Sequence, residues 1–512
     1  MLRRSSLVVL TVALLTVCAG LVAPGASAQS TAAAVPPATV EGPIPGNIVV
    51  TGVGFDLATV GYEQAEFFLS GTASSYTSAT SLATDGKWTV SVKDTAPYKT
   101  RAVVYRPIDA SKFNGTVVVE WMNVTSGMDT QADWMQAHVA LIREGFAYVG
   151  VSAQRVGIEG VPGSQFAAFA PKGADPARYA SLNLPTGNAD DSYTTDNYSY
   201  DIYTQAGRAV RDQAAVLLSG LVPKHLLADG ESQSAIRLAT YVDAVAPTAK
   251  AFDGYLLHSR GNLAAPLYTD PSGQQFATGS VNAPNPTLIR TDLGVPVLNF
   301  STETDLYQLG YLWARQPDTK TFRSWEVPGT AHADSYTLGI SRTDTGDGKG
   351  DVELFQSMLT PSSKPYGLFD CASPVNGGQQ TYALRSAFLA LDKWVASGTP
   401  PASMPRVPID TNQPSKRILD ANEMVKGGMR TPAVQAPVAT LTGVGQSGSR
   451  FCALFGTTTP FTSAQITKHY ASHSEFTKAW NGAVDAAVKA GVVLDGDAQH
   501  IKDAAAQSDV GK

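Results

Sequence analysis

Short apolar segments alternate with helical segments between residues 115 and 400, and this alternation limits the possible folds most strongly. The apolar segments include "GTVVVEW", "FAYVGVSA" and "VPVLNFS", whose β-branched residues are typical of buried strands. The segment 203–219 carries Val210, Ala214 and Leu217 at helical spacing. A second such series is Leu384, Phe388, Leu391 and Val395. We therefore expect an α/β fold in which helices cover both faces of a mostly parallel sheet.

Two regions depart from this alternation. The early strand-like segments "YEQAEFFLSG", "KWTVSVKD" and "TRAVVYRP" follow one another without helices, which predicts a mixed sheet or a small N-terminal β layer. The later segments 153–202, rich in Tyr, and 260–292, rich in Pro, Asn and Gly, lack strong periodicity. Long insertions in compact domains are usually lids or binding loops, or are disordered. We expect lid-like insertions, with 153–202 a possible lid and a static surface loop as the alternative.

The N-terminus has the three parts of a secretory signal peptide. A basic start, "MLRR", precedes an apolar run and the small-residue cleavage pattern "ASA". The run is short for a membrane-spanning helix, so we expect residues 1–28 to be removed on export, a retained anchor being the alternative. Residues 29–45, rich in Ala and Pro, predict a linker. Residues 46–400 then form the main domain, and 401–512 a C-terminal extension.

The charge balance excludes several partners. The chain has 38 basic and 44 acidic residues. Removing the signal peptide takes away Arg3 and Arg4, which leaves 36 basic residues and a net charge of −8. Without a basic run, nucleic acid and anionic membranes are not expected partners, and no later segment is apolar enough to predict an integral membrane span. The histidines and cysteines lack metal-ligand spacing, so neither a metal nor another cofactor is expected.

Two cysteines, Cys371 and Cys452, remain after the predicted cleavage. In an oxidising compartment, such a pair usually forms a disulfide. Closing so long a loop contributes roughly 4 kcal/mol in the loop-entropy model. Two free buried thiols are the alternative.

The pattern Gly-x-Ser-x-small occurs twice, at 230–234 ("GESQS") and at 445–449 ("GQSGS"). The first follows an apolar strand and begins a helix, which is the setting of a nucleophile elbow. Small residues at 230 and 234 let the strand and the helix pass close together, and the turn lifts Ser232 above the edge of the sheet. A helix N-cap is the alternative for this serine. The second pattern is read as a flexible surface turn.

Candidate partners for Ser232 follow two later strands. A serine needs a positioned base, and the base needs a carboxylate that orients it. His332 follows the strand "FRSWEV", and Glu303 and Asp305 follow "VPVLNFS". The order serine, acid, histidine is that of α/β-hydrolases. We predict Ser232 as nucleophile, His332 as base and Asp305, in preference to Glu303, as the acid; His258, at another strand end, is the reserve base.

Acyl transfer also requires donors that stabilise the oxyanion. The residue after the nucleophile, Gln233, supplies one backbone N–H in this type of site. The second donor is expected in the loop that follows "GTVVVEW", so we predict Met122 or Asn123.

Several stretches resemble a bacterial family described only as "alpha/beta hydrolase domain": "VVEWMNVTSG", "ADGESQSAIRL", "NFSTETDLY", "WEVPGTAHAD", "GGMRTPAV" and "CALFGTTTPF". The resemblance spans most of the chain after the signal peptide. It implies one hydrolase domain, with residues 401–512 folded onto it, and Ser232, Asp305 and His332 as the triad. Ser234 replaces the usual Gly of the elbow.

The predicted function is that of a secreted serine hydrolase that cleaves small-molecule carboxylic esters. An amidase, a peptidase or an acyltransferase with the same triad is the alternative. A binding protein on a hydrolase scaffold is a further one. The sequence predicts no oligomeric state.

Overall fold

A computed structural model describes residues 35–164, 166–185, 196–270, 279–449 and 451–512. The predicted signal peptide, residues 1–28, lies outside the described residues. Residues from 35 onward form one compact unit. Within the described part of the chain, no helix is long and apolar enough to cross a membrane.

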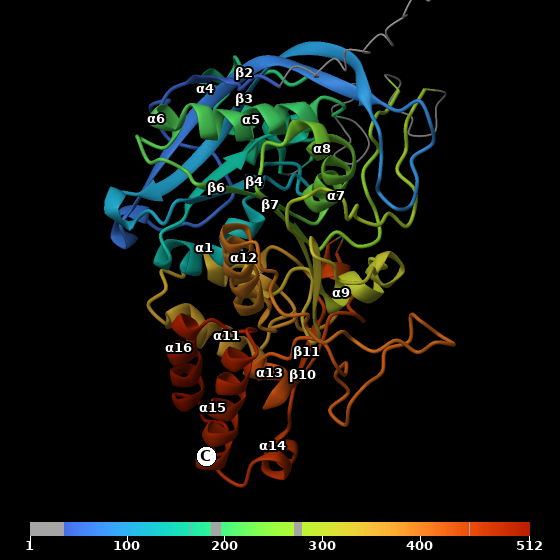
Figure 1. Cartoon of the computed structure of the whole chain (residues 1–512). Coiled ribbons are helices and arrows are strands. Elements are labelled where there is room, and N and C mark those ends of the chain that lie inside the picture. Colours follow the sequence, from blue (N-terminus) through green and yellow to red (C-terminus); the bar gives the residue numbers. More distant parts are fainter. Residues whose placement is uncertain (1–34, 165, 186–195, 271–278, 450) are drawn as a thin grey trace, which may run out of the picture. The chain divides into compact units, whose positions relative to one another are not determined.

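A nine-stranded sheet, with strand order β1-β2-β3-β5-β4-β6-β7-β8-β9, forms the centre of this unit (Figure 1). Its strands are β1 (Thr39–Glu41), β2 (Tyr62–Thr77), β3 (Ser91–Pro107), β4 (Thr116–Trp121), β5 (Ala147–Val151), β6 (His225–Glu231), β7 (Gly254–His258), β8 (Val297–Thr302) and β9 (Phe322–Val327). The first four strands of this order pair antiparallel, and the strands from β5 to β9 pair parallel. The mixed sheet, and not a separate β layer, is therefore the correct one of the two predicted arrangements.

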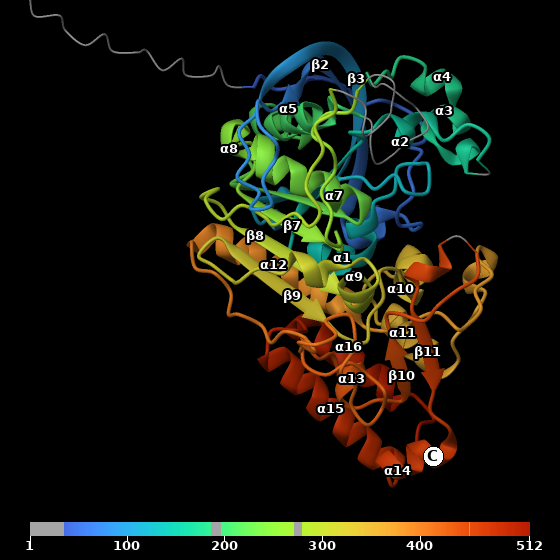
Figure 2. The same cartoon turned by 90° about the vertical axis from the view of Figure 1, so that its right-hand side faces the viewer.

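Helices cover both faces of the sheet, as the sequence predicts (Figure 2). On one face lie α5 (Ser199–Asp212), α7 (Gln233–Thr240) and α8 (Ala246–Ala249); on the other lie α1 (Ala132–Arg143) and α12 (Gln380–Ser397). The position of β4 in the sheet explains why the segment "GTVVVEW" is continuously apolar. Val117 and Val119 belong to the core under α5, whereas Val118 belongs to the core under α1 and α12. Both faces of the strand are buried, so neither face admits a polar pattern.

Further helices connect these elements or flank the site. They are α2 (Arg155–Glu159), α3 (Pro171–Ala174), α4 (Pro176–Tyr179), α6 (Ala214–Leu217), α9 (Glu303–Tyr307), α10 (Ser335–Leu338) and α11 (Lys349–Leu359). The helix predicted at 203–219 is observed as α5 and α6, which are separated by Gln213.

The predicted linker 29–45 needs a correction. Residues 39–41 form β1, which pairs with β2 so that Thr39 lies opposite Ser70. The backbone of this short segment pairs with the hydrogen-bonding groups at the edge of the long strand β2. The Ala- and Pro-rich sequence around it gives no sign of this pairing. Conversely, the β-branched segment 47–53 forms no strand; its Thr51 makes only an isolated bridge to Thr130.

The extension 401–512 forms α13 (Pro432–Gln435), β10 (Ala439–Thr442), β11 (Thr457–Pro460), α14 (Ser463–His469), α15 (His473–Lys489) and α16 (Asp495–Ala506). Its Tyr470, Phe476 and Trp480 belong to the core that lies under α1 and α12. Trp480 of α15 packs edge-on against Phe355 of α11, with ring centroids 5.0 Å apart. The extension therefore shares a hydrophobic core with the sheet.

Cys371 and Cys452 form the predicted disulfide, with their Cα atoms 5.5 Å apart. We expect the double variant Cys371→Ser, Cys452→Ser to lose about 2–4 kcal/mol of free energy of unfolding, because the unfolded chain regains the freedom of a long loop. Urea denaturation with and without a reductant measures this difference. The reductant should lower the stability of the wild type to that of the variant and leave the variant unchanged. Equal stability of the wild type and the variant without reductant would contradict a stabilising disulfide.

Candidate active site

Ser232 lies in the sharp turn between β6 and α7. Its backbone is in a strained conformation with φ 55° and ψ −117°, and its N–H donates to the His258 carbonyl at 2.8 Å. A Cβ at Gly230 would lie 3.1 Å from the Ser234 backbone, which is tighter than an ordinary contact, so the turn favours glycine there. The Ser232 side chain makes no capping hydrogen bond to α7, whose residues are all described. Ser232 thus occupies the N-cap position of α7, but its hydroxyl does not cap the helix, so capping does not account for a serine at this position.

The structure brings the three predicted residues into one hydrogen-bonded chain. The Ser232 Oγ lies 2.7 Å from the His332 Nε2, and the His332 Nδ1 lies 2.7 Å from the Asp305 Oδ1. The other oxygen of Asp305 accepts hydrogen bonds from the Thr302 N–H and the Ser259 hydroxyl, both at 2.6 Å. Burial raises the pKa of Asp305, but the His332 charge and these hydrogen bonds outweigh it, so this pKa lies below its ordinary value.

The two alternative residues have other partners. Glu303 accepts from the Gly329 N–H at 2.9 Å and pairs with Arg417 of the extension at 3.1 Å. It therefore ties the loop before His332 to the extension and does not contact the imidazole. The buried imidazole of His258 is bonded through Nδ1 to Asp133 at 2.6 Å and is not the partner of the Ser232 hydroxyl.

Glu231, which immediately precedes Ser232, belongs to the site but was not among the residues predicted from the sequence. Its Oε1 lies 3.3 Å from the His332 Nε2, and its Oε2 accepts from the Asn123 side chain at 3.0 Å. Burial raises the pKa of Glu231 to about 7, against the opposing effect of the His332 and His258 charges. Burial lowers the pKa of His332, but the Glu231 and Asp305 carboxylates outweigh it and raise this pKa to about 9. The signal for this residue was a carboxylate beside the serine in "GESQS".

We expect Glu231→Gln to move the acidic limb of the pH profile of kcat/KM to lower pH. A base must be neutral to accept a proton, so activity falls as the pH drops through the pKa of His332. Glutamine removes one of the two charges that raise this pKa and keeps an oxygen that can accept from Asn123. Glu303→Gln is the matched control and should leave the limb in place. An unchanged limb in Glu231→Gln would show that Glu231 does not act on His332.

The predicted oxyanion donors Met122 and Asn123 need a correction. The Met122 N–H donates to the Val151 carbonyl at 3.2 Å, and the Asn123 N–H donates to the Thr130 carbonyl at 2.9 Å. Both backbone donors are thus used within the fold, because the chain after β4 continues to pair with its neighbours. Asn123 acts through its side chain instead, on Glu231. Gln233 is the first residue of α7, directly after the nucleophile position, as the elbow requires.

A pocket of about 590 Å³ contains Ser232, His332, Glu231 and Asn123. It is lined from one side by residues 48–51, by the loop 123–130 and by α1. The possible lid 153–202 contributes Phe166, Phe169 and Ala174, while its residues 165 and 186–195 lie outside the described part. Among the described residues, no group of His, Cys, Asp and Glu side chains could hold a metal ion.

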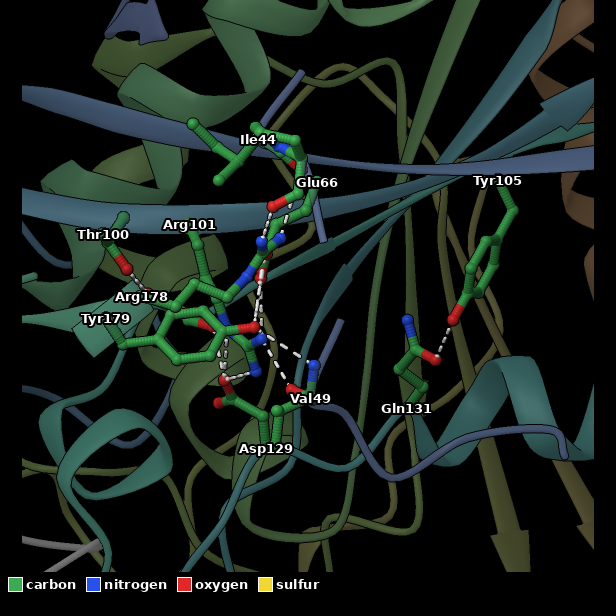
Figure 3. A network of polar contacts seen from close by, with 12 residues as sticks. Ile44, Val49, Glu66, Thr100, Arg101, Tyr105, Asp129, Gln131, Arg178 and Tyr179 are labelled. Carbon is green, nitrogen blue, oxygen red and sulfur yellow. Dashed lines mark hydrogen bonds and ion pairs between the residues drawn. The ribbon is translucent and has the colours of Figure 1, made fainter. Parts of the chain in front are cut away.

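A buried ion network fixes the pocket wall at residues 48–51 (Figure 3). Arg101 of β3 pairs with Glu66 of β2 at 2.9 Å and with Asp129 at 2.6 Å, and all three side chains are fully buried. Arg101 also donates to the Val49 carbonyl at 2.6 Å, and the Tyr179 hydroxyl of α4 accepts from the Val49 N–H at 3.1 Å. The network therefore joins the sheet to the pocket wall and to the possible lid.

The mostly parallel sheet and the serine at a strand–helix turn, bonded to a histidine and an aspartate that follow later strands, define an α/β-hydrolase. Residues 34–503 match the family model "Alpha/beta hydrolase domain", and the chain belongs to this family. This confirms the resemblance that the sequence motifs indicated.

Comparison with solved structures gives matches of low sequence identity and low TM-score. An esterase from Rhizomucor miehei is 11% identical over 50% of this chain and 74% of its own, with a TM-score of 0.23. A thermostable esterase from Pseudomonas putida is 14% identical over 54% and 75%, with a TM-score of 0.25. Oligopeptidase B from Trypanosoma brucei is 12% identical over 53% and 34%, with a TM-score of 0.26. The search of curated proteins finds no match.

Proposed function

We propose that this protein is a secreted serine hydrolase that cleaves carboxylic esters. The observation that carries the proposal is the hydrogen-bonded chain from Ser232 through His332 to Asp305, whose serine end lies in a largely apolar pocket. The signal-peptide pattern of the sequence and the disulfide between Cys371 and Cys452 support export to an oxidising compartment.

The proposed reaction has two halves. His332 Nε2 accepts the hydroxyl proton while Ser232 Oγ attacks the ester carbonyl, and the Asp305 carboxylate stabilises the imidazolium. The Gln233 backbone N–H, at the start of α7, stabilises the oxyanion. The tetrahedral intermediate collapses, the C–O bond to the alcohol breaks, and the alcohol leaves with the proton from His332. A water molecule then attacks the acyl-enzyme, His332 takes its proton and returns it to Ser232 Oγ, and the carboxylic acid is released.

Hydrolysis of p-nitrophenyl butyrate and of the corresponding p-nitroanilide tests this proposal. We expect faster cleavage of the ester, and a loss of about 10⁴-fold or more in kcat for Ser232→Ala. Ser447→Ala, in the second Gly-x-Ser-x-small pattern, is the matched control and should retain activity. Faster cleavage of the anilide would favour an amidase. Equal rates for the wild type and Ser232→Ala would contradict catalysis by this serine and favour a binding protein.

A further inference from the structure

The pocket beside Ser232 has one side that is apolar and aromatic. Its lining residues in 333–369 and 451–455 are apolar, except Thr337 and Arg342. We propose, on the basis of the proposed function, that the site selects esters with a large apolar alkyl or aryl group, which packs against this side.

Four residues, Phe369, Phe451, Leu454 and Phe455, form what we call the aromatic wall. Phe369 packs edge-on against Phe455 and Phe451, with ring centroids 5.0 Å and 6.2 Å apart. The disulfide of Cys371 and Cys452 belongs to the same cluster and joins the two segments that carry these rings. A wall held in this way presents a preformed apolar surface, so little ordering of side chains opposes the binding of an apolar group.

The aromatic wall also lies close to the reacting groups. Ala333, the residue after His332, donates its N–H to the Leu454 carbonyl at 3.3 Å and belongs to the cluster of the wall. An ester whose carbonyl carbon is held at Ser232 can therefore place a neighbouring alkyl or aryl group against the wall. Burying such a group stabilises the bound ester in proportion to the apolar area removed from water.

Several polar lining side chains already hydrogen-bond within the protein. The buried Thr125 Oγ1 and Gln136 Oε1 have no hydrogen-bond partner among the described residues. The Gln136 amide donates to the Thr337 hydroxyl, and the Ser126 and Thr130 hydroxyls lie 3.3 Å apart. The Asn123 side-chain amide donates a hydrogen bond to the Glu231 carboxylate. The hydroxyl groups of a sugar ring bound here would lose their hydrogen bonds to water and gain few protein partners. An alkyl or aryl group has no such hydrogen bonds to lose.

Apolar side chains continue to the outside of the pocket. Phe169, in the possible lid, and Leu368, beside the aromatic wall, both line the pocket and are each 62% exposed. An alkyl chain that is longer than the pocket can therefore extend along apolar surface, so we expect no sharp upper limit of chain length.

Two ester series test this inference: p-nitrophenyl esters of acids from acetate to decanoate, and butyrates of alcohols from methanol to octanol. We expect kcat/KM to rise roughly three- to fourfold per added CH₂ over the first additions in at least one series. It is overturned if neither series rises, or if methyl glucuronate or an acetylated xylo-oligosaccharide is cleaved with a higher kcat/KM than every alkyl ester.

Phe369→Ala tests the wall directly. We expect it to lower kcat/KM for the octanoate ester by roughly tenfold and to leave acetate within about twofold. Phe461→Ala, a partly buried phenylalanine stacked on His469 outside the pocket, is the matched control and should change neither. Leu368→Ser, at a largely exposed position, should lower octanoate cleavage even if the first variant folds poorly. Equal effects on acetate and octanoate in both pocket variants would overturn the inference.

The acetate ester separates the two proposals. Hydrolysis of acetate that depends on Ser232, without any gain from longer chains, overturns the apolar preference and leaves the proposed hydrolase intact. No hydrolysis of any ester, with no labelling of Ser232 by a fluorophosphonate, overturns the proposed function itself.

Discussion

Asp305→Asn should lower kcat for p-nitrophenyl butyrate by roughly 10³- to 10⁴-fold. The Asp305 carboxylate accepts a hydrogen bond from His332 Nδ1 at 2.7 Å, which leaves Nε2 free of a proton and able to accept the one from Ser232. An amide at this position can donate to Nδ1 instead, which favours the tautomer with a proton on Nε2. Steady-state kinetics measures the loss, and circular dichroism checks that the fold is unchanged.

Glu303→Gln is the matched control for this substitution. Glu303 lies two residues before Asp305 in the first turn of α9, but it contacts Gly329, Thr442 and Arg417 and not the imidazole. We expect its kcat to stay within about tenfold of the wild type, because the hydrogen bonds of the catalytic groups remain. A larger loss in Glu303→Gln than in Asp305→Asn would assign the orienting acid to Glu303.

Arg101→Leu should lower the free energy of unfolding by about 3–5 kcal/mol. It leaves the buried Asp129 without its cation and leaves the buried Glu66 with Arg178 alone. Glu66 and Asp129 are both fully buried and both pair with this guanidinium (Figure 3). Arg101 also holds the carbonyl of Val49, a residue of the pocket wall, so we expect activity to fall together with stability.

Urea denaturation measures this effect against a matched control. Arg211→Leu removes a guanidinium that pairs with Asp253 at 2.8 Å, where both side chains are more than a third exposed. Exposed pairs contribute little, so we expect a change below about 1 kcal/mol. An equal loss in the free energy of unfolding for the two substitutions would contradict the larger contribution that we assign to the buried Arg101 pairs.

The sheet and its helices could be predicted because their signal is local. Val117, Val118 and Val119 are all apolar since β4 is buried on both faces, and the elbow is marked by small residues around Ser232. The choice between Glu303 and Asp305 is different. Side chains two positions apart on a helix point in directions about 200° apart around its axis. Only one of the two can therefore face His332, and the orientation of α9 on the sheet decides which one.

Other features depend on contacts that no local pattern encodes. Arg101 lies 35 residues from Glu66 and 28 from Asp129, and nothing in its strand marks it as a buried cation. The oxyanion prediction failed at Met122 because the chain continues to pair with β5 beyond the end of β4. Glu231 could have been considered, since it adjoins the serine, but its contact with His332 depends on where the later loop returns.

Labelling with a fluorophosphonate tests most directly whether Ser232 is an activated nucleophile. We expect the wild type to gain the mass of one phosphonyl group, located by peptide mass spectrometry on Ser232. Ser447→Ala should label equally, and Ser232→Ala and His332→Ala should label far more slowly or not at all. Absence of labelling in the folded wild type, or a label on another serine that persists in Ser232→Ala, would contradict the proposed mechanism.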